Sequence, residues 1–202
     1  MIKKLFILTL LISTFLSLTI SAQNPPAPTR VRGNIEKMDT DSIVFKERRG
    51  EILKIALAPN LNITEVFPIK ISEIQENAYI GTATLTNPSG KLEALEVLVF
   101  PEAMRGTGEG HYAWDLMPGS MMTNATVSQL RSIGNTRELK LDYKGGNQVV
   151  FVPENAPIVT FRPGTFSLLV PQANAILTVI QKDGQPVVTR IVVGKDGFKP
   201  PM

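Results

Sequence analysis

One short segment of the chain concentrates the side chains with the most distinctive chemistry. Four of the seven methionines fall within nineteen positions, and the only histidine lies among them. Thioether and imidazole groups both suit copper, so this pattern raises the hypothesis of a soft-metal site. The irregular spacing favours the alternative that the methionines fill gaps beneath a long connecting segment and that no cofactor is bound. The candidate metal ligands are Met104, His111, Met117, Met121 and Met122.

The same segment, residues 101–124, is also the best candidate for binding without a metal. It holds the only tryptophan, Trp114, in addition to the histidine. A structureless connection of this length is typically functional or disordered. Side chains of these types are more often packed than mobile, so we expect an ordered segment with Trp114 in a groove against one β-barrel. The candidate binding residues are Met104, Arg105, Glu109, His111, Trp114 and Asp115.

The residue types and their spacing give little support for a catalytic site. There is no cysteine, and a Ser-His-Asp triad would have to combine His111 with Asp115 and Ser120 in one irregular segment. The glycine-rich run 106–110 contains an acid and leads into no helix, unlike a phosphate-binding loop, so its glycines are expected to serve tight turns. Most acidic residues lie at turns or on the polar faces of strands, as solvated surface does. We therefore expect no enzymatic activity.

The first residues are typical of an export signal. Two lysines precede an apolar run over residues 5–20, and two small residues follow it. The run is shorter than a spanning helix needs, so we expect cleavage after Ala22, a periplasmic or secreted location, and no stable membrane span after removal of residues 1–22. A proline-rich linker follows at 23–29. Without the signal the formal net charge falls from +3 to +1, a weak basis for nucleic-acid binding.

The rest of the chain reads as two copies of one all-β unit. A shift of 94 positions superimposes the strand-turn-strand stretch 79–100 on 173–194. Alternating apolar and polar residues predict five strands in each copy, the third ending near residue 60, with a brief helical element before the fourth. This order is that of OB-like barrels, so we expect an all-β protein of two tandem five-stranded OB-like barrels. The predicted boundaries are 30–101 for the first barrel, 102–123 for the Gly/Met-rich segment between them and 124–202 for the second barrel.

Several local motifs are specific enough to compare with known families. They are 100–111 (FPEAMRGTGEGH), 114–115 (WD), 118–120 (PGS), 122–126 (MTNAT) and 194–197 (GKDG). On these motifs the chain resembles an exported bacterial family of unknown function with tandem OB-like β-barrel domains, whose members often carry the label "metal ABC transporter permease". The resemblance implies the fold and location given above. It implies little about activity, because a permease needs several spanning helices and this sequence offers only its signal.

These observations favour a non-catalytic binding or interaction module outside the cytoplasm. The expected partner is an envelope protein or a small ligand. Nucleic acid is not expected, because the aromatic residues of the strands are scattered rather than interleaved with basic ones. Copper or another soft metal in segment 102–123 is the alternative function, and an unrecognised hydrolase is a third.

Overall fold

The structure is a computed structural model that describes residues 27–134 and 136–201. Strands make up nearly all of its regular structure, and the helices are single 3₁₀ turns. The all-β prediction is confirmed. The predicted export signal, residues 1–22, lies outside the described residues. Within the described part, none of the helices has the length and apolar character needed to cross a membrane.

Twelve strands and three 3₁₀ turns form the described part of the chain. The strands are β1 (Thr29–Met38), β2 (Ser42–Glu47), β3 (Ile52–Pro68), β4 (Tyr79–Thr86), β5 (Leu92–Val99), β6 (Gly110–Ala113), β7 (Met121–Ile133), β8 (Thr136–Tyr143), β9 (Gly146–Val152), β10 (Ile158–Pro163), β11 (Asn174–Lys182) and β12 (Gln185–Gly194). The turns are η1 (Ile71–Glu73), η2 (Glu102–Met104) and η3 (Phe166–Leu168).

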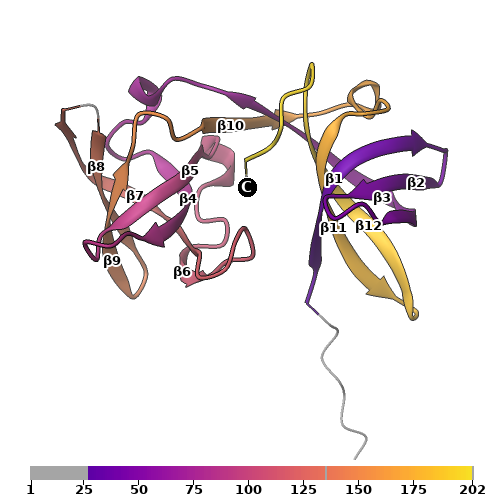
Figure 1. The fold of residues 1–202 in the computed structure, drawn as a ribbon, viewed down its shortest axis with the longest axis horizontal. Coiled ribbons are helices and arrows are strands. Elements are labelled where there is room, and N and C mark those ends of the chain that lie inside the picture. The colour runs from indigo at the N-terminus through magenta and orange to yellow at the C-terminus, as the bar shows by residue number, and fades with distance from the viewer. Residues whose placement is uncertain (1–26, 135, 202) are drawn as a thin grey trace, which may run out of the picture.

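Five strands close a first barrel, seen at the right of Figure 1. Around the ring the order is β1, β2, β3, β12 and β11, and all neighbours are antiparallel except the parallel pair β3–β12. Alternate residues of each strand face inward. The interior is filled by fully buried apolar side chains such as Ile35, Phe45 and Leu177. The barrel core therefore needs no disulfide, which agrees with the absence of cysteine.

Five other strands form a second ring, seen at the left of Figure 1. The order is β7, β8, β9, β5 and β4, and the ring closes through a short parallel pairing of β5 with β9 at Leu92–Val150 and Glu93–Phe151. Its interior holds fully buried side chains such as Ile80 and Leu139. We call this ring the second barrel. The two barrels share one strand order, with the parallel pair in the same place.

The prediction that each half of the chain closes its own barrel is wrong. Hairpin β4–β5 lies in the first predicted domain, 30–101, but completes the second barrel. Hairpin β11–β12 lies in the second predicted domain, 124–202, but completes the first barrel. The two halves thus each donate a hairpin to the other barrel. Alternation in the sequence reports which face of a strand is buried, but it does not report which strand lies beside it.

The crossing between barrels is made by β3 and β10. Strand β3 does not end near residue 60, because Pro59 falls in an irregular stretch where the pairing with β12 shifts register and no backbone donor is required. The strand runs on to Pro68, and its far end pairs antiparallel with β10, which also pairs in parallel with β5. Figure 1 shows β10 spanning the gap between the barrels. The sequence reading missed β10 and β6.

A small apolar core also joins the barrels. It is formed by outward-facing side chains of β3, β5, β10, β11 and β12, and Phe100, Met104 and Phe198 pack against it. Burial of this surface adds to the backbone pairing through β10, so the barrels are fixed relative to each other. The buried members are Val66, Leu98, Val159, Phe161, Ile176 and Val192.

Candidate functional site

A cavity of about 230 Å³ lies between the two barrels, beside this small core. Its walls come from strands of both barrels, from β10 and from the segment that joins β5 to β7. Aromatic and aliphatic side chains make up much of the lining, which is typical of sites for small ligands. The lining includes the charged residues Arg30, Glu96 and Arg190 and the aromatic residues Phe100, Trp114 and Phe161.

Two β-bulges place the charged residues of this cavity. In hairpin β4–β5 the register shifts directly after the Ala83–Glu96 pair, and in hairpin β11–β12 directly after the Thr178–Arg190 pair. A bulge bends its strand and re-aims the neighbouring side chain, so each hairpin turns one charged residue out of its barrel interior. The shift of 94 positions that relates the two halves superimposes Glu96 on Arg190. The cavity therefore receives an acid from one hairpin and a base from the other.

Glu96 is the more unusual of the two. Its side chain is only 1% exposed, and its Oε1 accepts a hydrogen bond of 3.1 Å from the backbone N–H of Ala83. Its Oε2 is buried and has no hydrogen-bond partner among the described residues. Burial raises the pKa of Glu96 to about 8, opposed by the Ala83 hydrogen bond. Glu96 is therefore mostly protonated at neutral pH, and because Oε1 accepts the Ala83 hydrogen bond, a proton on Oε2 makes that atom a donor.

Arg190 and Trp114 add two more unpaired donors. The Nε of Arg190 and the indole Nε1 of Trp114 are both buried, and neither has a hydrogen-bond partner in the described part of the chain. The guanidinium carbon of Arg190 lies 5.4 Å from the ring centre of Phe161, and burial lowers the pKa of Arg190. Three buried donors without acceptors thus belong to residues that line one cavity.

The side chain of Trp114 lies against the first barrel. The guanidinium carbon of Arg30, on β1 of the first barrel, lies 3.9 Å from the ring centre of Trp114. The backbone of Trp114 is held by Ser120, with Trp114 N–H donating to the Ser120 carbonyl at 2.8 Å. Strand β6, just before Trp114, pairs with β7 of the second barrel. The indole therefore bridges the two barrels.

A glycine allows the backbone of the connecting segment to pack closely against other residues of the cavity wall. Gly108 has φ of +58°, a left-handed conformation that other residues rarely adopt. A Cβ there would lie 3.0 Å from Nδ2 of Asn124 and 3.2 Å from the hydroxyl of Tyr112, two other lining residues. The turn role expected for the glycine run thus holds at Gly108.

Other predicted binding residues fix the segment rather than line the cavity. Asp115 accepts hydrogen bonds from Arg32 at 2.9 and 3.1 Å, and these bonds lower the pKa of Asp115. Arg105 pairs with Glu102 at 2.6 Å and donates to the backbone carbonyl of Asn77, just before β4. Glu109 accepts from the backbone N–H of Lys144 at 2.9 Å. These contacts tie the segment down at several points.

The candidate metal ligands do not converge on one point. His111 Nδ1 lies 2.8 Å from the Thr123 hydroxyl oxygen. Successive residues of a strand point to opposite faces, so Met121 and Met122 diverge, and Met122 lines the cavity. Met104 packs against the inter-barrel core and Met117 is exposed. The described residues contain no group of three or more histidine or carboxylate side chains suited to a metal. Soft-metal binding remains a prediction.

The residues that best define the cavity were missed by the sequence reading. Glu96 and Arg190 each interrupt an apolar strand stretch, 92–99 and 185–194, at positions related by the 94-residue shift. A charged residue inside an apolar run is the sequence feature that could have identified them, because buried charged residues are uncommon unless they are paired or functional. No comparable sequence feature marks Arg30 as a residue of the cavity.

The chain matches no protein-family model, and no curated protein or solved structure shows significant similarity to it. The resemblance to an exported family therefore stays a prediction, and the cavity must be interpreted from its own geometry.

Proposed function

We propose that this protein is a non-catalytic binding module that acts outside the cytoplasm and holds a small, largely apolar molecule bearing a hydrogen-bond acceptor in the cavity between its barrels. The extracytoplasmic part of the proposal rests on the signal-like residues 1–22. The binding part rests on the cavity. A carboxylate or carbonyl group on an aromatic or aliphatic body is the ligand chemistry that suits it.

The observation that carries the proposal is the set of unpaired donors on Glu96, Trp114 and Arg190. A buried polar group without a partner costs about 1–3 kcal/mol, so three of them at one cavity oppose folding unless something accepts their hydrogen bonds. A ligand acceptor group would relieve this cost. Phe100 and Phe161, which are also in the lining, would cover the apolar part of the ligand.

The charge of the cavity favours a neutral or anionic ligand. Arg30 and Arg190 both line it, whereas its carboxyl, on Glu96, is neutral at pH 7 because of burial. A cationic ligand would meet two positive charges without a compensating one. The lining residues include no histidine and no second carboxyl, which is why we propose binding rather than acid-base catalysis.

Three probes of similar size test this assignment by calorimetry. Benzoate, benzyl alcohol and benzylamine share one ring and differ in charge. We expect benzoate to bind most tightly and benzylamine least. Arg190→Gln should weaken benzoate binding by about tenfold, because it removes a charge-assisted contact. The matched control is Arg131→Gln, an exposed arginine on β7 that does not line the cavity.

Two results would contradict the proposal. One is equal affinity, or no affinity, for all three probes. The other is an equal loss of benzoate binding in the Arg190 and Arg131 variants, which would show a general charge effect. Heat-unfolding curves of both variants identify any loss that comes from misfolding.

A further inference from the structure

A second cavity, of about 380 Å³, lies beside the first along β11 and is strongly basic. Ile176 contributes to the lining of both cavities, and so lies between them. Three cationic side chains from separate parts of the chain line this second cavity, namely Arg32, Arg48 and Lys199. Its lining contains no aspartate or glutamate among the described residues.

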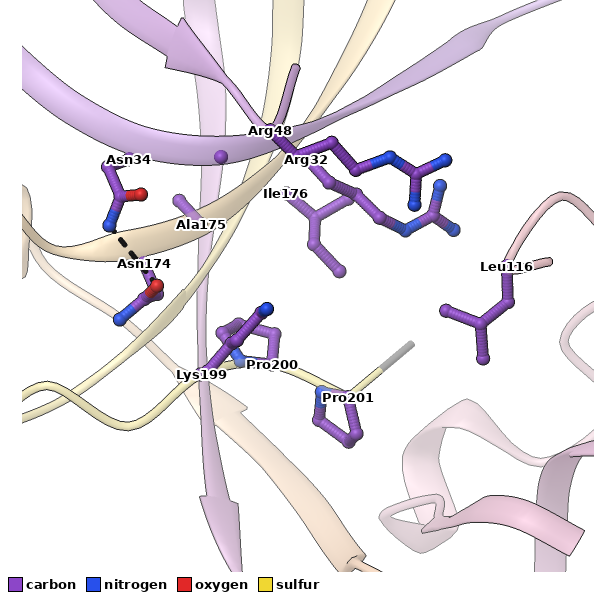
Figure 2. Close-up of a pocket in the computed structure, with 11 residues that line it drawn as sticks. Arg32, Asn34, Arg48, Leu116, Asn174, Ala175, Ile176, Lys199, Pro200 and Pro201 are labelled. Carbon is purple, nitrogen blue, oxygen red and sulfur yellow. Dashed lines mark hydrogen bonds between the residues drawn. The ribbon is translucent and has the colours of Figure 1, made fainter. Parts of the chain in front are cut away.

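The arrangement of the cations is visible in Figure 2. The side chains of Arg32 and Arg48 extend along the same side of the cavity, and Lys199 points into it from the opposite side. The two arginines are neighbours, because the backbone N–H of Arg48 donates to the carbonyl of Arg32 at 2.9 Å. Leu116 lies on a separate segment, across from the two arginine side chains. A small ion in the cavity would therefore be approached from more than one direction.

The positive charge is only partly compensated. Arg32 is paired with Asp115, which lies outside the lining. The contact of Arg48 with a carboxylate is a 3.8 Å approach to Glu47, and Lys199 makes no ion pair within the described part of the chain. Arg48 and Lys199 are therefore the cations of this cavity with the least compensation. Like charges held together repel one another, so an anion between them would be favoured.

Hydrogen bonds hold the cavity in shape without an ion. Asn34 Nδ2 donates to Oδ1 of Asn174 at 3.1 Å, which links β1 to β11. Asn174 Nδ2 in turn donates to the carbonyl of Gly197 at 3.1 Å. The second bond fixes the segment that carries Lys199 against the first barrel. Little ordering is therefore needed when a ligand enters, which favours affinity.

We propose that this basic cavity is an oxyanion site that takes a phosphate group. Arginine side chains present planar pairs of N–H donors that match phosphate oxygens, and lysine adds a point charge. Arg48 and Lys199, with Arg32 beside them, suit a doubly charged tetrahedral anion better than a single carboxylate. The phosphate can be free inorganic phosphate or the headgroup of a phospholipid, since both present the same oxygens. The site is separate from the benzoate-type site proposed above.

Calorimetric titration with inorganic phosphate at constant ionic strength tests the site, with acetate as a singly charged comparison. We expect phosphate to bind and acetate to bind more weakly. The double variant Arg48→Gln/Lys199→Gln should bind phosphate about tenfold more weakly or worse. Arg131→Gln/Lys182→Gln is the matched control, because it removes one arginine and one lysine from exposed positions outside both cavities. It should bind as the unaltered protein does.

A second measurement separates the two sources of phosphate. Phosphatidylcholine vesicles with and without phosphatidic acid are sedimented with each protein. Binding to phosphatidic acid that only the Arg48/Lys199 variant loses supports a lipid headgroup, whereas phosphate binding without sedimentation supports the free ion. The proposal is overturned if phosphate does not bind, or if both double variants lose binding equally. Benzoate binding should persist in the Arg48/Lys199 variant, so failure here is distinguishable from failure of the first cavity.

Discussion

Glu96→Gln is the substitution that tests the first cavity most sharply. It keeps the size of the side chain and preserves the oxygen that accepts from Ala83, but it removes the group that titrates. In the unaltered protein, burial holds the pKa of Glu96 at about 8, against an ordinary value of 4.5. The folded chain therefore retains a proton over a pH range in which the unfolded chain has released it.

The size and sign of the effect follow from this difference. Below about pH 4.5 both states carry the proton, and above about pH 8 neither does, so the free energy of unfolding changes only between these limits. There it falls as pH rises, by about 1.4 kcal/mol for each pH unit, because the folded state binds more protons. The whole interval amounts to on the order of 5 kcal/mol. The variant lacks this dependence.

Urea unfolding at a series of pH values between 4 and 9, followed by circular dichroism, measures the effect. We expect the unaltered protein to lose stability relative to Glu96→Gln as the pH rises through this range. Asp115 and Glu65, whose pKa values are lowered by arginine partners, act at the acidic end in both proteins and cancel in the difference. Glu93→Gln, at an exposed position of the same strand, is the control. A difference between the two proteins that does not change with pH would refute the reasoning.

Three further outcomes are expected. Residues 124–202 expressed alone lack hairpin β4–β5, so the fragment should show no cooperative thermal unfolding, and a sharp transition by circular dichroism would contradict the exchanged hairpins. Intact-mass measurement of the exported protein should find Gln23 at the amino terminus, whereas a species that keeps residues 1–22 would contradict cleavage. Copper should quench Trp114 emission equally in the unaltered protein and in His111→Ala/Met122→Ala, because these side chains do not converge, and a loss of quenching at low stoichiometry in the variant would revive the soft-metal hypothesis.

Local features of the fold could be predicted from the sequence, but strand partners could not. Alternation correctly located most strands, and the helical element before the fourth strand is present as η1. The exchange of hairpins was not predictable, because each hairpin has the same buried pattern whichever barrel it completes. Pro59 misled the reading of β3, since the rule that proline ends a central strand fails where the register is already irregular.

The candidate site was located in part. The prediction that Trp114 packs against a barrel agrees with its contact with Arg30, because a large aromatic side chain is rarely left exposed. Glu96 and Arg190 were not predicted as site residues, because they lie on strands far apart in the chain. Only the fold brings these two residues to one cavity. The copper hypothesis rested on the number of methionines that lie close together in the sequence. Adjacent strand residues such as Met121 and Met122 face opposite sides, so closeness in sequence does not bring their sulfur atoms together.

The indole N–H signal of Trp114 in proton–nitrogen NMR spectra tests the central proposal most directly. The chain contains one tryptophan, so the spectrum contains one such signal from a group that is buried and unpaired. Addition of benzoate should move this signal downfield in a saturable way, because the carboxylate accepts a hydrogen bond from Nε1, and the movement should be much weaker in Arg190→Gln. A signal that stays in place while benzoate binds, or that moves equally in Arg190→Gln and Arg131→Gln, would contradict a ligand site between the barrels.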